Sequence, residues 1–133
     1  MPQMIVLDTH AWFWWINLEH QRFSASMRAA LERSETLGAS VVSCYEIALA
    51  ARRGRLLLPC ATSQWFLEAL EPSGVRLLPL SPEIASLAVE LTAIHRDPFD
   101  RMIIATTLIH EATLISLDGV FHHYPELRDR LLA

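Results

Sequence analysis

Two acidic residues directly follow apolar runs in this chain. Asp8 comes after the run M-I-V-L, and Asp118 comes after an apolar segment that ends at Leu117. Continuous apolar runs are typical of strands that are buried on both faces of a parallel sheet. The carboxyl ends of such strands form the edge at which α/β proteins bind ligands. We therefore expect both carboxylates to lie at that edge.

Two further acids are predicted near the same edge. Glu46 follows a second predicted strand and lies in the first turn of a helix, and Asp100 lies in the first turn of a later helix. Clustered carboxylates repel one another and take up protons unless a cation balances them. Mg²⁺ or Mn²⁺ would do so, and either ion activates water for attack on a phosphodiester. The candidate metal ligands and catalytic residues are thus Asp8, Glu46, Asp100 and Asp118.

Structural interpretations of these acids remain open. Ser43 and Glu46 match a capping box, in which the glutamate only returns a hydrogen bond to the backbone of the serine. Asp97 is better explained as a helix cap than as a ligand, and the Asp-Gly dipeptide at Asp118 is common in turns. Asp8 has no evident structural reason to follow a buried run. Convergence of all four acids by chance is less expected than any single coincidence.

Strands and helices are predicted to alternate along the chain. The strands are expected at residues 4–7, 39–42, 75–80 and 112–117. The helices are expected at residues 10–17, from a Ser24 cap to Gly38, from Ser43 to about residue 52 before Gly54, from a Thr62 cap to about residue 70, from a Ser81 cap to about residue 91, and at residues 98–109. This alternation predicts an α/β fold with a mostly parallel sheet covered on both faces. A chain of 133 residues suits one domain, which we place at residues 1–133.

Charge and composition exclude several classes of protein function. The net charge of −4 gives no long-range attraction for nucleic acid, so a polyanion must be held by local contacts. All 11 basic residues are arginine, which excludes P-loops and Schiff-base chemistry. A receiver-like signalling module needs a lysine beside its acids and is disfavoured for that reason. A haloacid-dehalogenase-type phosphatase needs D-x-D, whereas Asp8, Thr9 and His10 supply one acid.

The remaining polar and aromatic residues are less specific. Arg52, Arg53 and Arg55 could contact phosphate or could form an ordinary solvated helix end. The tryptophans near residue 12 could stack on bases, but we expect them in the core or in an interface. No zinc-ligand spacing is evident, so the histidines are interpreted as structural or surface residues, with His10 nearest the proposed site; the others considered are His95, His122 and His123.

The composition also leads us to expect a particular cellular compartment and oligomeric state. Cys44 and Cys60 form no metal or disulfide pattern, so we expect reduced, partly buried thiols in a cytoplasmic protein. The apolar stretch at residues 4–16 is too short to span a bilayer and has no basic flank, so neither a signal peptide nor a membrane segment is expected. The 52% apolar content favours an oligomer that hides part of its surface.

Four ordered motifs resemble those of the PIN-domain nucleases, and within them the VapC-type toxins of bacterial toxin-antitoxin pairs. They are I-V-L-D-T-H from Ile5, S-x-x-E from Ser43, H-R-D-P-F-D-R-M-I-I-A from His95, and L-I-S-L-D from Leu114. The resemblance implies a three-layer α/β/α fold with four to five central strands. It also implies an endoribonuclease that uses Mg²⁺ or Mn²⁺, a cognate antitoxin and a homodimer.

The resemblance also assigns roles residue by residue. Asp8, Glu46 and Asp100 match the three core acids, and Asp118 matches a fourth, more variable one. Thr9 and Ser116 match hydroxyl residues found beside the first and fourth acids. Asp97 and Arg101 are further supporting residues, and Arg101 could contact phosphate or pair with an acid. Asp100 is preferred to Asp97 as the ligand because it heads D-x-x-I-I-A. A catalytically inactive PIN-like binding module is the surviving alternative, and the complete set of acids argues against it.

Overall fold

A parallel sheet forms the centre of the molecule in the computed structural model, which describes residues 3–94 and 96–133. His95 lies outside the described residues. The strands are β1 (Met4–Leu7), β2 (Thr36–Ser40), β3 (Val75–Leu78), β4 (Thr113–Ile115) and β5 (Leu131–Leu132). Their order is β3-β2-β1-β4-β5, and every pairing is parallel. The predicted parallel sheet is confirmed, with a short fifth strand beyond the four located from the sequence.

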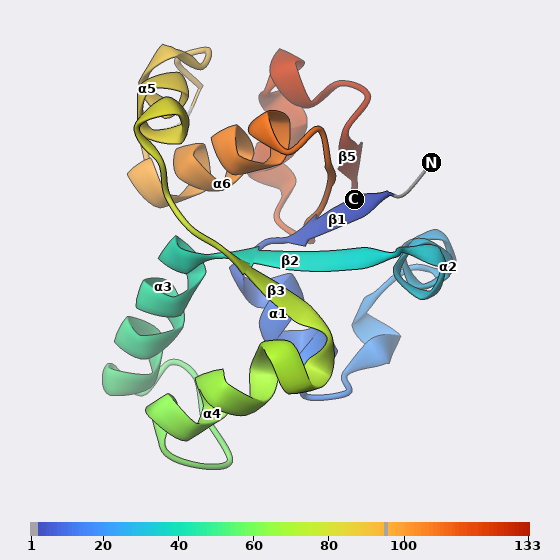
Figure 1. Cartoon of the computed structure of the whole chain (residues 1–133), viewed down its shortest axis with the longest axis vertical. Helices are drawn as coiled ribbons and strands as arrows, with labels where there is room; N and C mark the ends of the chain where they lie inside the picture. Colours follow the sequence, from blue (N-terminus) through green and yellow to red (C-terminus); the bar gives the residue numbers. More distant parts are fainter. Residues whose placement is uncertain (1–2, 95) are drawn as a thin grey trace.

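Helices cover both faces of this sheet. The α-helices are α1 (Thr9–Ile16), α2 (Ala25–Arg33), α3 (Val41–Arg52), α4 (Thr62–Ala69), α5 (Pro82–Glu90) and α6 (Pro98–Ile109). Short 3₁₀ segments add η1 (His20–Arg22), η2 (Glu71–Ser73), η3 (Gly119–His123) and η4 (Pro125–Leu127). In Figure 1, α1, α3 and α4 lie on one side of the sheet, α5 and α6 lie on the other, and α2 lies at the end of β2. Side chains of α2 belong to the same core as those of α1 and α4. The predicted three-layer α/β/α arrangement is confirmed.

The central strand β1 explains why its sequence is apolar at every position. Ile5 and Leu7 belong to the core between the sheet and α1 to α4, whereas Val6 belongs to the core against α6. Successive side chains of a strand point to opposite faces, so a strand between two helical layers must be apolar on both. The strand ends at Leu7, and Asp8 follows it as the N-cap residue of α1.

Local capping signals located several helices correctly. Ser24 and Ser81 accept hydrogen bonds from the backbone N–H groups of Met27 and Ile84, which begin α2 and α5 as predicted. Thr62 was expected to cap α4 but is its first residue, and the preceding Ala61 provides no side-chain cap. A local sequence signal therefore placed this helix within one residue but misidentified its cap.

Two boundaries around β2 differ from the prediction. The helix α2 ends at Arg33, and Gly38 lies inside β2 rather than at the end of that helix. A Cβ atom at Gly38 would lie 2.7 Å from Cδ1 of the buried Leu78 on β3, so the glycine allows the two strands to approach. The strand stops at Ser40, whose hydroxyl caps α3 by accepting from the N–H of Val42 at 3.2 Å. The predicted strand at residues 39–42 therefore began and ended too late.

Aromatic and sulfur side chains follow the expectation in part. Trp12 is fully buried, and its indole Nε1 donates to the carbonyl of Ala69 at 3.0 Å. Trp14 and Trp15 are only partly buried on the same helix. Both cysteines are free and half-buried.

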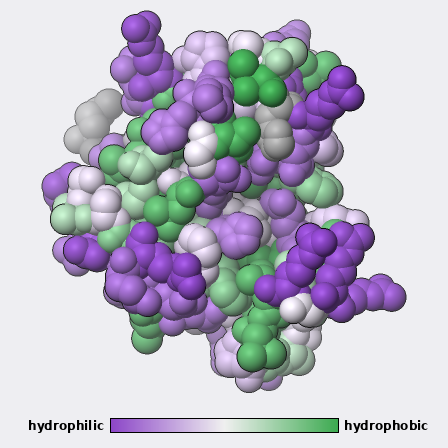
Figure 2. All heavy atoms as spheres, turned by 180° about the vertical axis from the view of Figure 1, so that it is seen from behind, coloured by the Kyte–Doolittle hydropathy of each residue, from purple (hydrophilic) through white to green (hydrophobic). Residues whose placement is uncertain are grey.

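Apolar side chains also reach the surface. Leu57, Val89 and Leu67 are 93%, 81% and 73% exposed. Figure 2 shows one face on which hydrophobic side chains lie among hydrophilic ones. None of the helices in the described residues is long and apolar enough to cross a membrane.

Candidate active site

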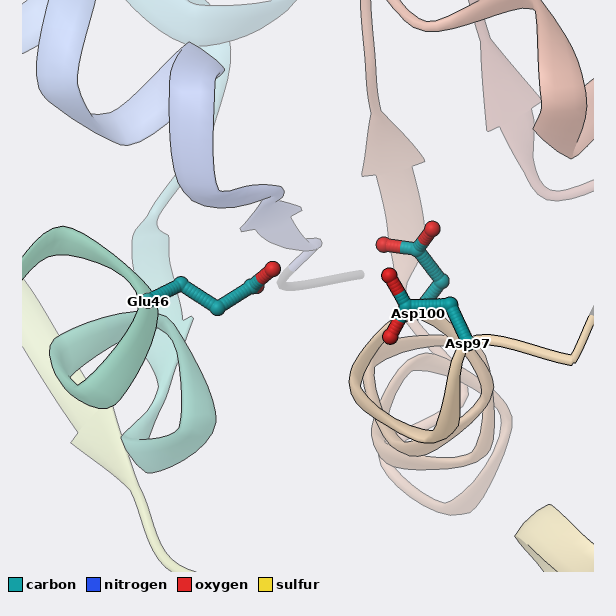
Figure 3. Close-up of side chains that lie close together, drawn as sticks. All are labelled: Glu46, Asp97 and Asp100. Carbon is teal, nitrogen blue, oxygen red and sulfur yellow. The ribbon is translucent and has the colours of Figure 1, made fainter. Parts of the chain in front are cut away.

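Three acids from two helices form a cluster. Among the described residues, Glu46, Asp97 and Asp100 each offer a carboxylate oxygen, and these oxygens all lie within 4.8 Å of one another. Figure 3 shows Glu46 extending from α3 toward the two aspartates at the start of α6. All three side chains are half-buried. Such an oxygen-only set matches the ligands that hard divalent cations prefer.

Asp97 therefore has two roles where the sequence favoured one. Its Oδ1 accepts from the N–H of Phe99 at 2.9 Å and caps α6, as predicted. The same carboxylate also belongs to the acidic cluster with Asp100. A cap precedes its helix and Asp100 follows three residues later, so one helical turn brings both carboxylates toward α3.

Asp8 lies beside this cluster and is buried at the end of β1. Contrary to the sequence interpretation, it has a structural reason to be there: its Oδ1 accepts from the N–H of Ala11 at 2.8 Å and caps α1. Its Oδ2 accepts from the hydroxyl of Ser116, which follows β4. Burial raises the pKa of Asp8, and these two hydrogen bonds oppose that shift only in part. A nearby positive charge would therefore stabilise its ionised form.

Glu46 is hydrogen-bonded to the hydroxyl of Thr9, which is itself hydrogen-bonded to the buried hydroxyl of Ser43. The hydroxyl of Thr9 is 2.5 Å from Oε1 of Glu46 and 2.9 Å from the hydroxyl of Ser43. Thr9 has one proton to give, so when Glu46 is ionised Thr9 donates to it and Ser43 donates to Thr9. Burial raises the pKa of Glu46, and repulsion from Asp97 and Asp8 adds to the shift. The charges of Asp8 and Asp97 therefore both act on Glu46.

The capping-box interpretation of Ser43 and Glu46 is wrong. Ser40 caps α3, which places Ser43 and Glu46 inside the helix rather than at its N-terminus. They are three residues apart, so both side chains point from one face of α3 toward Thr9. The supporting role of Ser43 was missed because its spacing to Glu46 had been explained by a cap. The register set by Ser40 would have revealed it.

Asp118 lies near Asp8 but outside the acidic cluster. It is exposed, and its Oδ1 accepts from the N–H of Val120 at the start of η3, in agreement with the turn interpretation. It also raises the pKa of Asp8 by repulsion. The structure does not bring Asp118 into the cluster of Glu46, Asp97 and Asp100.

Arg101 makes hydrogen bonds within the protein, where the sequence had suggested phosphate contact as one of its possible roles. Its guanidinium group donates to backbone carbonyls at the end of α5 and just after it, those of Ala88, Val89, Leu91 and Thr92, and lies 3.4 Å from the hydroxyl of Tyr124. Five donors in a rigid fork suit such an array of carbonyl oxygens. Arg101 is therefore a structural link between α5, α6 and Tyr124, and its charge also acts on the acid Glu126.

Two of the three clustered arginines border the acids. A pocket of about 370 Å³ is lined by Glu46, Asp97, Arg53 and Arg55, together with Thr9, His10, Phe99 and apolar residues of α3. Arg52 does not line it. We call this the arginine pocket. Its position makes Arg53 and Arg55 candidates for phosphate contact beside the carboxylates.

Comparison with known proteins agrees with this geometry. A family model described as "PIN domain" matches residues 5–127. Ribonuclease VapC22 of Mycobacterium tuberculosis is 32% identical to this chain over 115 residues, which cover 86% of each protein.

Solved structures share the fold at low sequence identity. VapBC2 from Rickettsia felis, bound to a DNA fragment from its promoter, matches with a TM-score of 0.69 at 15% identity, covering 98% of each chain. FitAcB from Neisseria gonorrhoeae matches with a TM-score of 0.61 at 24% identity, covering 98% of this chain and 97% of the other. These two likenesses concern architecture alone, whereas the family model and the VapC22 relative each span most of the sequence. The chain belongs to the PIN-domain family.

Proposed function

We propose that this chain is a metal-dependent endoribonuclease, the toxin of a toxin-antitoxin pair, acting in the cytoplasm as a single domain over residues 1–133. The observation that carries the proposal is the set of carboxylates of Glu46, Asp97 and Asp100 within 4.8 Å of one another, beside the buried Asp8. The likeness to a ribonuclease at 32% identity supports the reaction class.

The chemistry of the acids fits a divalent cation. Their oxygens are hard ligands, and burial raises the pKa of Asp8 and of Glu46 because the hydrogen bonds to these carboxylates offset the desolvation only in part. We assign the ion, Mg²⁺ or Mn²⁺, to Glu46, Asp97 and Asp100, with Asp8 beside it. Asp118 is retained as a fourth, outer acid because its charge acts on Asp8.

Neighbouring residues prepare these carboxylates. Ser116 orients Asp8, and Thr9 orients Glu46 by donating to the oxygen that must remain unprotonated. Arg53 and Arg55 hold phosphate oxygens of the RNA in the arginine pocket. A bound divalent cation supplies the positive charge that polarises a phosphoryl oxygen and lowers the pKa of an attacking water. The protein needs no side-chain nucleophile.

Cleavage of RNA by the purified protein tests this proposal. We expect hydrolysis with Mg²⁺ or Mn²⁺, loss of hydrolysis with a chelator, and loss in Asp8→Asn and Asp100→Asn with unchanged circular dichroism. Asn also caps helices, so Asp8→Asn preserves the start of α1. Glu90→Gln, an exposed change on α5, is the matched control. Full activity in both aspartate variants would reject the assignment.

We also propose an antitoxin partner and a homodimer. The support for an antitoxin is the structural likeness to toxin-antitoxin complexes. The support for further buried surface is a groove of about 850 Å³ between α4 and β3, lined by Phe66, Leu67, Leu70, Val75 and Leu77 among others. Sedimentation of the chain alone measures the homodimer, and sedimentation after co-expression with the protein encoded by the adjacent gene measures antitoxin binding. A monomer that binds no co-expressed protein would contradict them.

A further inference from the structure

A second pocket adjoins the arginine pocket at His10. It has a volume of about 360 Å³ and is lined by Asp8, His10, Trp14, Leu117, Asp118 and Gly119. We call it the aromatic pocket. His10 lines both pockets; Glu46 and Asp97 line the arginine pocket, and Asp8 and Asp118 line the aromatic pocket.

The wall of the aromatic pocket is a short stack of side chains. His10 and Trp14 are one helical turn apart on α1, and their ring centroids lie 5.3 Å apart at an interplanar angle of 37°. The guanidinium carbon of Arg22 lies 4.4 Å from the centroid of Trp14, and Glu19 holds that arginine at 2.9 Å. Trp14 is partly buried whereas His10 is exposed. The solvent-facing ring of this stack is therefore the imidazole.

Charge distinguishes what each pocket can accept. Each pocket is lined by two carboxylates, but in the arginine pocket Arg53 and Arg55 balance their charge, whereas the residues described as lining the aromatic pocket include no arginine. A phosphate group is repelled by those carboxylates. A nucleobase is neutral, has a flat face that stacks on an aromatic ring, and carries N–H groups that carboxylates accept.

We propose that the aromatic pocket binds the base of a nucleotide next to the cleaved phosphodiester, stacked on His10. This inference rests on the proposed ribonuclease function and names a subsite for its substrate. Stacking supplies affinity without charge, which a chain of net charge −4 needs. A base inside a duplex cannot reach a side pocket, so the subsite selects single-stranded RNA.

The matched histidines of this region provide the test. His10 and His20 each contact a tryptophan ring of α1. His10 is tilted against Trp14, and His20 stacks on Trp15 with centroids 4.2 Å apart. Of the two histidines, only His10 lines the pockets. Binding of a short fluorescein-labelled single-stranded oligoadenylate is measured by anisotropy in an Asp100→Asn background, which keeps the probe intact. We expect His10→Ala to weaken binding about tenfold and His20→Ala to leave it unchanged.

A probe without bases identifies the contact. An abasic ribose-phosphate oligomer of the same length should bind wild type and His10→Ala equally, because a probe without bases cannot stack on the imidazole. Gly119→Leu adds bulk where a Cβ meets no atom within 4 Å, so it should fold and cause the same base-dependent loss. Equal weakening toward both probes, or no weakening by either variant, would overturn the subsite. Failure of the wild-type protein to cleave RNA would instead count against the proposed function.

Discussion

Asp97 combines a capping bond with a place in the acidic cluster, and two substitutions can separate these roles. Asn caps a helix about as well as Asp but carries no charge, whereas Ala removes both, at a cost of about 1 kcal/mol for the cap. We expect Asp97→Asn to raise the Mg²⁺ concentration needed for half-maximal cleavage without changing stability. Asp97→Ala should raise it and also lower the free energy of unfolding in urea. Wild-type metal dependence in Asp97→Asn would leave capping as its only role.

Thr9 connects Ser43 to Glu46 and favours the ionised form of that glutamate. In Thr9→Val this hydrogen bond is lost, so the pKa of Glu46 rises further. Activity that requires ionised Glu46 should then fall at a higher pH as the solution is acidified. The pH dependence of kcat measures this shift, and Thr9→Ser should restore the wild-type profile because it keeps the hydroxyl. A merely structural loss would lower activity equally at every pH.

Within the helical elements, Arg101 determines how α5 joins α6. Its guanidinium bonds several carbonyls that the end of α5 leaves without helical partners. Arg101→Met should lower the free energy of unfolding by about 2–4 kcal/mol, since hydrogen bonds to charged groups are the strong ones. The folded fraction should still cleave RNA. Arg128→Met, at an exposed position, is the control, and equal stability of the two variants in urea would contradict this role.

For the whole molecule, the ionised forms of Asp8 and Glu46 oppose folding. Burial raises the pKa of each in the folded protein, so between about pH 4 and the raised values the folded protein binds more protons than the unfolded chain. The stability contributed by these groups therefore falls as pH rises through that window. Mg²⁺ should raise Tm, and more at pH 7 than at pH 5, because protons compete for the carboxylates.

Thermal unfolding at matched ionic strength measures this effect. The Asp100→Asn variant should show a smaller Mg²⁺ shift, since one ligand carries no charge. A shift that is identical in the variant, or larger at pH 5, would place the ion elsewhere.

Local signals in the sequence were sufficient for much of the architecture. The apolar run of β1, the Ser81 cap and the start of α6 at Asp97 each depend on neighbouring residues, so the sequence alone predicted them. The order of motifs also placed Glu46 and Asp100 near one edge. These features are determined by strand periodicity and helix capping, which act over a few residues.

Contacts between distant segments decided the rest. From the sequence, Gly38 was interpreted as a helix end, but in the fold it packs against Leu78 of β3. Ser43 was interpreted as a cap, but in the fold it contacts Thr9 of α1. Arg101 likewise finds its carbonyls only when α5 folds back on α6. Each of these three contacts depends on which helices and strands become neighbours. Only the assembled fold determines those neighbours, because burial and hydrogen bonding join groups that are far apart in the chain.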